Sequence, residues 1–173
     1  MIYFLDFDRT LFDTDAFAAH VLNGPRAASF KKESEETITK QLEILAEAGD
    51  LSFTDGELKA FVYKEVPEFL RMRGNDAVIL TYGNRTLQKM KIENALSGIP
   101  RLSVIYAGET RKGIYMKDRI AMYGAATLFL DDRAIELEDM ARECPQVRLY
   151  EMRRDGASGD GRWPVVRSLS ELP

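Results

Sequence analysis

Two nearly continuous apolar runs in the middle of the chain restrict its fold more than any other feature. Residues 77–80 read Ala-Val-Ile-Leu, and residues 127–130 read Thr-Leu-Phe-Leu. Strands of this kind are buried on both faces, which is typical of a parallel sheet with helices on its two sides. Together with four further short apolar runs, they predict strands at residues 2–6, 77–81, 102–107, 126–130, 146–150 and 165–168.

Helical segments separate the later strands. Asn84 is a candidate N-cap for a helix that carries Leu87, and apolar residues recur at helical spacing in 116–123 and 137–144. A chain of 173 residues has room for one α/β domain and a small lobe. The alternation predicts a doubly wound, Rossmann-like α/β fold, in which helices cover both faces of a parallel sheet.

One stretch interrupts this alternation. About 70 residues lie between the first and second strands, with several helix signals and no convincing strand. Thr14 is a candidate N-cap for the first of these helices. A single crossover helix does not need this length. We therefore expect an α/β core of residues 1–15 and 67–173, and a small helical insertion of residues 16–66.

Composition excludes several classes of protein. The net charge of −4 gives no electrostatic reason to expect nucleic acid or an anionic membrane as a partner. No segment is apolar enough to span a bilayer, and a four-residue apolar run followed by aspartates is no signal peptide. The single cysteine, Cys144, cannot form an internal disulfide. We expect a cytoplasmic protein of undetermined oligomeric state.

Polar residues follow each of the first four strands. Carboxyl ends of parallel strands meet at one edge of the sheet, where open α/β folds bind ligands. These residues are, in strand order, Asp6 and Asp8; Thr81 and Tyr82; Lys112 and Gly113; and Asp131 and Asp132.

This set of residue types suits phosphoryl transfer. A carboxylate can attack phosphorus and form an aspartyl-phosphate, which divides one difficult step into two. A cation must offset the repulsion between carboxylate and phosphate, and Mg²⁺ prefers oxygen ligands. A threonine hydroxyl, a lysine ammonium and loop N–H groups can hold the phosphoryl oxygens. The sequence therefore predicts a magnesium-dependent site for a phosphorylated substrate.

At these residues the chain resembles the haloacid dehalogenase superfamily, in its phosphatase branch. The resemblance covers about residues 1–15 and 72–150, and the motifs occur in the family's order. The four motifs are matched by Asp6-Phe7-Asp8-Arg9-Thr10, by Val78-Ile79-Leu80-Thr81, by a lysine, and by Phe129-Leu130-Asp131-Asp132.

The resemblance implies a role for each residue. Asp6 would be the nucleophile and a metal ligand, and Asp8 the general acid and base, with its backbone carbonyl on the metal. Thr81 and the N–H of Tyr82 would hold phosphoryl oxygens. Asp132 aligns best as the acidic metal ligand with Asp131 beside it, and which of the two binds directly stays open. Glu136, one helical turn further, would support this ligand.

Two lysines are candidates for the third motif. Lys112 precedes a glycine at a helix N-terminus, where the helix dipole also favours an anion. Lys117 lies within the same helix at a position expected to face solvent. We favour Lys112.

Asp8 and Arg9 distinguish this chain within the family. Dehalogenases of the superfamily lack an aspartate at the position of Asp8, so its presence favours phosphate esters. Arg9 stands where the family often has glycine, at a position that faces away from the phosphate in the family.

Two alternatives to a phosphatase remain. A phosphomutase or phosphonate hydrolase would use the same site but needs a more elaborate insertion than this one. A non-enzymatic phospho-acceptor or phosphate-binding regulator would use similar residues, although receiver domains carry their aspartate on a middle strand and lack an insertion. We expect a small phosphorylated substrate. Whether the insertion closes over the site is not determined by the sequence.

Overall fold

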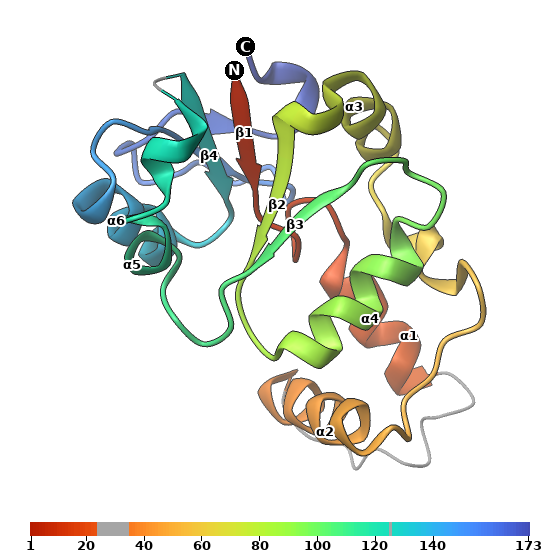
Figure 1. Cartoon of the computed structure of the whole chain (residues 1–173). Helices are drawn as coiled ribbons and strands as arrows, with labels where there is room; N and C mark the ends of the chain where they lie inside the picture. The colour runs from red at the N-terminus through yellow and green to blue at the C-terminus, as the bar shows by residue number, and fades with distance from the viewer. Residues whose placement is uncertain (24–34, 125) are drawn as a thin grey trace.

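The described part of the computed structural model, residues 1–23, 35–124 and 126–173, contains a single parallel sheet of six strands. Their order across the sheet is β3-β2-β1-β4-β5-β6 (Figure 1). Every predicted strand is present, with ends displaced by at most two residues. The strands are β1 (Ile2–Leu5), β2 (Ala77–Thr81), β3 (Ser103–Tyr106), β4 (Thr127–Asp131), β5 (Arg148–Met152) and β6 (Val165–Val166).

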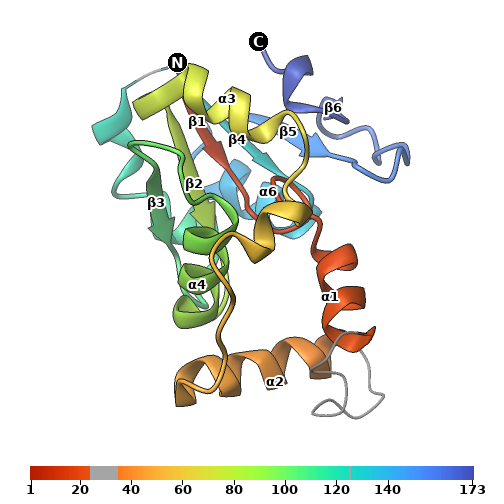
Figure 2. The same cartoon turned by 90° about the vertical axis from the view of Figure 1, so that its right-hand side faces the viewer.

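Helices cover both faces of the sheet (Figures 1 and 2), which confirms the predicted fold class. None of the helices in the described ranges is long and apolar enough to cross a bilayer. The α-helices are α1 (Thr14–Asn23), α2 (Glu35–Ala48), α3 (Val66–Arg73), α4 (Arg85–Ala95), α5 (Lys112–Met116) and α6 (Ala134–Glu143). Short 3₁₀ helices are η2 (Glu57–Phe61), η3 (Gly74–Asp76), η4 (Ile120–Tyr123) and η5 (Leu169–Glu171).

Successive side chains of β1 enter two separate hydrophobic cores. Tyr3 and Leu5 are buried in a core that includes residues of α3 and α4. Phe4 faces the other way and packs in a core with Met116 of α5 and Leu137 of α6. Each such buried side chain stabilises the fold by roughly 1.5–3 kcal/mol. The apolar runs of the sequence are therefore continuous because both sheet faces are covered.

β1 lies at the centre of the sheet, between β2 and β4. Leu5, its last residue, is paired in register with Ile79 of β2 and with Leu130 of β4. The chain that leaves β1 therefore emerges at the middle of the carboxyl edge, beside the ends of the two neighbouring strands. This arrangement brings the predicted polar strand ends together.

Helices α1 and α2 lie beyond the carboxyl edge of the sheet (Figure 2). Asp13, rather than the predicted Thr14, caps α1: its Oδ1 accepts a hydrogen bond from the N–H of Ala16 at 2.9 Å. The hydroxyl of Thr14 is directed instead to Asp8. The division of the chain into a core and an insertion of residues 16–66 stays a prediction.

The helix predicted over residues 116–123 is divided in two. α5 ends at Met116, and the N–H of Arg119 donates to the carbonyl of Met116 at 2.8 Å, an i to i+3 contact. A 3₁₀ helix, η4, then begins at Ile120. Met116 and Ile120 are nevertheless both buried in the same core. The apolar spacing therefore predicted the buried residues correctly, while the prediction of one continuous helix was wrong.

Candidate active site

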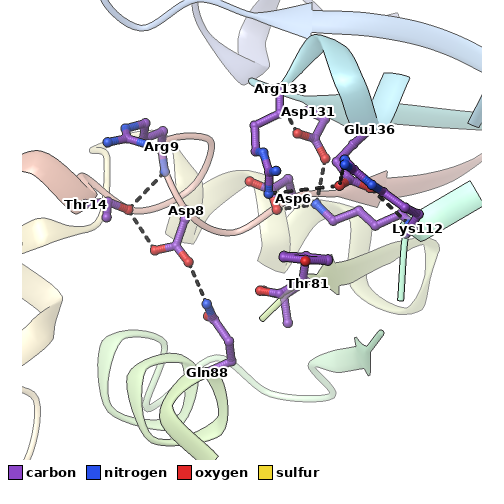
Figure 3. A network of polar contacts seen from close by, with 12 residues as sticks. Asp6, Asp8, Arg9, Thr14, Thr81, Gln88, Lys112, Asp131, Arg133 and Glu136 are labelled. Carbon is purple, nitrogen blue, oxygen red and sulfur yellow. Dashed lines mark hydrogen bonds and ion pairs between the residues drawn. The ribbon is translucent and has the colours of Figure 1, made fainter. Parts of the chain in front are cut away.

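Three charged side chains meet in the interior at the ends of β1 and β4 (Figure 3). The ammonium of Lys112 donates to Asp131 Oδ2 at 2.6 Å and also to Asp6 Oδ1. Lys112 is only 1% exposed. Burial opposes its charged form, but Asp131 and Asp6 outweigh burial and raise the pKa of Lys112. The favoured lysine is thus at the strand ends, whereas Lys117 is exposed.

Two features of the adjacent helices fix the start of α5 and with it Lys112. The buried carboxylate of Glu136 accepts from the backbone N–H of Lys112 and from Arg111 Nη1, both at 3.0 Å. A β-carbon on Gly113 would lie 2.4 Å from the carbonyl oxygen of Asp139 on α6, so only glycine fits there. Glu136 therefore positions Lys112 through the backbone of α5, and it makes no direct contact with the aspartates Asp131 and Asp132 among the described hydrogen bonds.

Carboxylates of Asp6, Asp131 and Asp132 lie within 4.8 Å of one another. Burial raises the pKa of Asp6. The attraction of Lys112 opposes this rise, whereas repulsion from Asp131 adds to it. Burial and repulsion from Asp6 raise the pKa of Asp132 to about 7. Crowded carboxylates of this kind are relieved by a divalent cation, and an all-oxygen donor set is the one that Mg²⁺ prefers. These residues fit such an ion.

The two aspartates at the end of β4 differ in their partners. Asp131 is fully buried, and both of its oxygens accept hydrogen bonds, Oδ2 from Lys112 and Oδ1 from the N–H of Arg133 at 2.9 Å. Asp132 is half-buried and accepts no hydrogen bond from the described residues. Its oxygens are therefore the more available for a cation.

Asp8 is directed away from this cluster, toward the helices (Figure 3). Its carboxylate accepts from Thr14 Oγ1 and from Gln88 Nε2, each at 2.7 Å, and from the ammonium of Lys91. Burial would raise the pKa of Asp8, but Lys91, Thr14 and Gln88 together lower it. Asp8 is therefore held as a carboxylate and has to take up a proton before it can donate one.

Two residues of α4 at this site, Gln88 and Lys91, were not predicted from the sequence, and Lys91 is the charged one. It lies on the buried face of α4, and its ammonium is 5.4 Å from the ring centroid of Phe7 and 5.2 Å from that of Phe12. These distances are in the range of cation–π attraction. The sequence signal that could have identified these residues is that Gln88 and Lys91, which are polar, lie on the same helix face as the apolar Leu87.

Thr81 and Tyr82 lie at the same edge of the sheet. Thr81 is buried at the end of β2, beside Asp6 and Lys112 in Figure 3. Its hydroxyl donates to the carbonyl of Tyr82 at 3.5 Å, which is too long for a strong hydrogen bond and leaves the group available. The Tyr82 ring lies 5.2 Å from the guanidinium carbon of Arg133.

Arg9 takes a left-handed backbone conformation, with φ 56°. Glycine adopts this conformation without strain, whereas residues with a side chain adopt it rarely. The Arg9 guanidinium donates to Asp15 Oδ1 on α1, at 3.1 and 2.9 Å. This side chain is thus partly exposed and paired with the first helix.

A cavity of about 310 Å³ lies over these residues, lined by Asp6, Asp8, Lys112 and Asp132 among others. Its opposite wall comes from the helices that follow β1. The wall residues are Phe17 and Ala18 of α1, and Ile38, Thr39, Leu42 and Glu43 of α2. Within the described residues, the helices after β1 therefore form a wall over the polar strand ends.

Solved structures of haloacid dehalogenase-like hydrolases share this architecture. The proposed HAD-hydrolase YfnB from Bacillus subtilis, bound to magnesium, is 16% identical with a TM-score of 0.63, over 99% of this chain and 96% of that one. A proposed haloacid dehalogenase-like hydrolase from Burkholderia xenovorans is 17% identical with a TM-score of 0.65, over 99% and 94%. A haloacid dehalogenase-like family hydrolase from Xanthomonas campestris is 14% identical with a TM-score of 0.52, over 95% and 88%.

At this level of identity the comparison concerns the fold. No protein-family model matches the sequence, and no curated protein is significantly similar to it. The chain has the fold of the haloacid dehalogenase-like hydrolases, as its four motifs predict.

Proposed function

We propose that this chain is a haloacid dehalogenase-like phosphatase that hydrolyses a phosphate monoester with the help of Mg²⁺. The observation that carries the proposal is the cluster of Asp6, Lys112, Asp131 and Asp132 at the base of a cavity that Asp8 also lines. This combines a nucleophile, a cation site and a proton carrier within one small space. The shared fold and the order of the four motifs support the same reaction class.

In the first step, an Asp6 oxygen attacks phosphorus and the bond from phosphorus to the ester oxygen breaks. Asp8, which takes up a proton from solvent before this step, gives it to the departing oxygen, which leaves as an alcohol. In the second step Asp8 takes a proton from water, and the resulting hydroxide cleaves the aspartyl-phosphate to phosphate and free Asp6. Such proton transfers contribute typically 10²- to 10⁴-fold to a rate.

Lys112, Thr81 and the backbone N–H of Tyr82 would hold the phosphoryl oxygens through the reaction. Asp6, Asp132 and the carbonyl of Asp8 would bind Mg²⁺, with Asp131 positioning Lys112 and the chain around it. The ion, when bound, supplies positive charge that offsets the repulsion between the phosphate and Asp6.

The proposal is tested by phosphate release from para-nitrophenyl phosphate with purified protein and Mg²⁺. We expect turnover that a chelator abolishes and that Asp6→Asn reduces at least about 10³-fold, because the amide is no nucleophile. Asp15→Asn is the matched control, since Asp15 is an exposed aspartate of α1, and it should retain activity. Turnover that survives Asp6→Asn would overturn the assignment of the nucleophile.

The same assay separates the alternatives. A phosphomutase would transfer phosphate to a sugar phosphate in preference to water. A phospho-acceptor or regulator would accumulate a long-lived phospho-protein and release no phosphate.

A further inference from the structure

The wall that α1, α2 and α4 contribute to the cavity is mainly apolar, although Thr39 and Glu43 of α2 also line it. Phe17 of α1, Leu42 of α2 and Leu87 of α4 line the cavity and are each at most 4% exposed. Ile38, also on α2, extends the same surface. These side chains come from three helices and line the same cavity as the carboxylate cluster.

Several charged residues along the cavity away from Asp132 already have partners. Glu43 accepts from the ammonium of Lys40 at 3.1 Å, and Lys91 is paired with Asp8. The guanidinium carbon of Arg133 lies 5.2 Å from the ring centroid of Tyr82. A polar leaving group would therefore have to compete with existing ion pairs for its hydrogen bonds.

One buried acceptor remains. Gln88 Nε2 donates to Asp8, which fixes the orientation of the amide, and Gln88 Oε1 has no hydrogen-bond partner among the described residues. This oxygen is buried away from solvent, so it offers no accessible acceptor to a bound molecule. Each hydroxyl of a bound molecule that is buried without a partner costs about 1–3 kcal/mol.

We infer that the cavity selects a phosphate monoester whose leaving group is compact and mainly apolar, rather than a polyol or sugar. This inference rests on the proposed phosphatase function and specifies its substrate class. The apolar wall stabilises such a group by removing its surface from water. The volume of about 310 Å³ is at the small end of ligand cavities, which fits a leaving group of a few carbons.

Two esters with closely similar leaving oxygens test the inference: n-butyl phosphate and glycerol 3-phosphate. Both are primary alkyl monoesters of similar size, but the glycerol ester carries two hydroxyls and the butyl ester carries only carbon and hydrogen beyond its ester oxygen. We expect kcat/KM for n-butyl phosphate to exceed that for glycerol 3-phosphate at least about tenfold. Because this ratio is measured on the wild-type chain, it does not depend on the folding of a variant.

Substitutions on α2 test whether its apolar side chains cause the preference for n-butyl phosphate over glycerol 3-phosphate. Leu42→Gln should reduce the ratio at least about fivefold, and Ile38→Thr should reduce it in the same direction, because each places a polar group on the wall. Ile44→Gln is the control on the same helix, since Ile44 is 57% exposed and does not line the cavity. It should leave the ratio unchanged.

The outcomes separate the inference from the function on which it rests. Asp6-dependent hydrolysis that favours glycerol 3-phosphate, or a ratio that Ile44→Gln changes as much as Leu42→Gln does, overturns the inference and leaves the phosphatase standing. Absence of Asp6-dependent phosphate release from every ester, para-nitrophenyl phosphate included, overturns the phosphatase itself.

Discussion

The carboxylate of Asp8 contacts side chains that lie on two different helices, and each of these side chains helps to orient it. Thr14 approaches from α1, while Gln88 and Lys91 approach from α4. Together they orient the Asp8 carboxylate at the border between the carboxylate cluster and the apolar wall. A proton carrier has to be placed accurately as well as protonated, so these contacts should affect turnover more than binding.

Lys91→Met tests this positioning. We expect kcat to fall about tenfold or more while KM changes less than about threefold, because Lys91 contacts Asp8 and not the cluster around Asp6. Steady-state kinetics with para-nitrophenyl phosphate measure both values. Lys89→Met, on the exposed side of α4, is the control and should behave as wild type. An unchanged kcat in Lys91→Met would contradict the role.

The sequence is informative about some of these residues and silent about others. Asp6, Lys112 and Asp132 could be placed together because each follows a strand, and parallel strands end at one edge. Lys91 follows no strand. It lies on a helix face that periodicity assigns to the core, and only the tertiary structure shows that its ammonium meets Asp8.

Among the elements, α5 is a short helix that is closely packed against α6. It has five residues, and Gly113 brings its backbone against the carbonyl of Asp139 on α6. The N–H of Ile114 also donates to Asp139 Oδ2 at 3.0 Å. A shift of α5 would therefore displace Lys112, its first residue.

Gly113→Ala should separate these two helices. The added methyl group meets backbone atoms that cannot move aside, so we expect a loss of about 1–3 kcal/mol in the free energy of unfolding. Phosphate release should fall as well, because Lys112 moves. Thermal denaturation and the para-nitrophenyl phosphate assay measure the two effects. Ile114→Ala, at an exposed neighbouring position, should change neither by much, and a wild-type melting temperature in Gly113→Ala would contradict the packing argument.

Helices and strands were predictable from the sequence where burial determines the spacing of the apolar residues. All six strands follow from apolar runs, and α6 from Leu137 and Met140 at helical spacing. The spacing of Met116 and Ile120 is equally compatible with one helix or with two short ones. Local sequence could not distinguish Asp13 from Thr14 as a cap either, since both residue types cap helices well.

For the molecule as a whole, Arg154 joins three segments that are distant in sequence. Its guanidinium donates to the carbonyl of Thr10 at 3.1 and 2.7 Å, to the carbonyl of Arg167 at 3.2 Å, and to the carboxylate of Glu65. The ring centroid of Tyr63 is 4.0 Å from the guanidinium carbon. Arg154 thus connects the loop after β1 with the approach to α3 and with the chain beyond β6.

Arg154→Met should lower the free energy of unfolding by about 2–4 kcal/mol, because several charge-assisted hydrogen bonds are lost together. Burial would raise the pKa of Glu65, but its hydrogen bond with Arg154 lowers it below the ordinary 4.5. A lowered pKa stabilises the folded state above pH 4.5 and loses this effect as the pH falls through the folded value.

The difference between wild type and Arg154→Met should therefore shrink as the pH falls from about 6 to 3, as measured by chemical denaturation. Arg167→Met is the control, because the Arg167 side chain is exposed while its carbonyl is retained. A difference that grows on acidification would contradict the role of Glu65.

The central position of β1 also affects how the protein is made. This strand precedes both of its neighbours, β2 and β4, in the chain, and β4 ends at Asp131. Until that residue emerges, the strand leading to Asp6 lacks one neighbour. Pairing between segments so distant in sequence is slow to form. The three carboxylates therefore come together only after β4 has been synthesised, and a nascent chain that ends before Asp131 lacks the cluster.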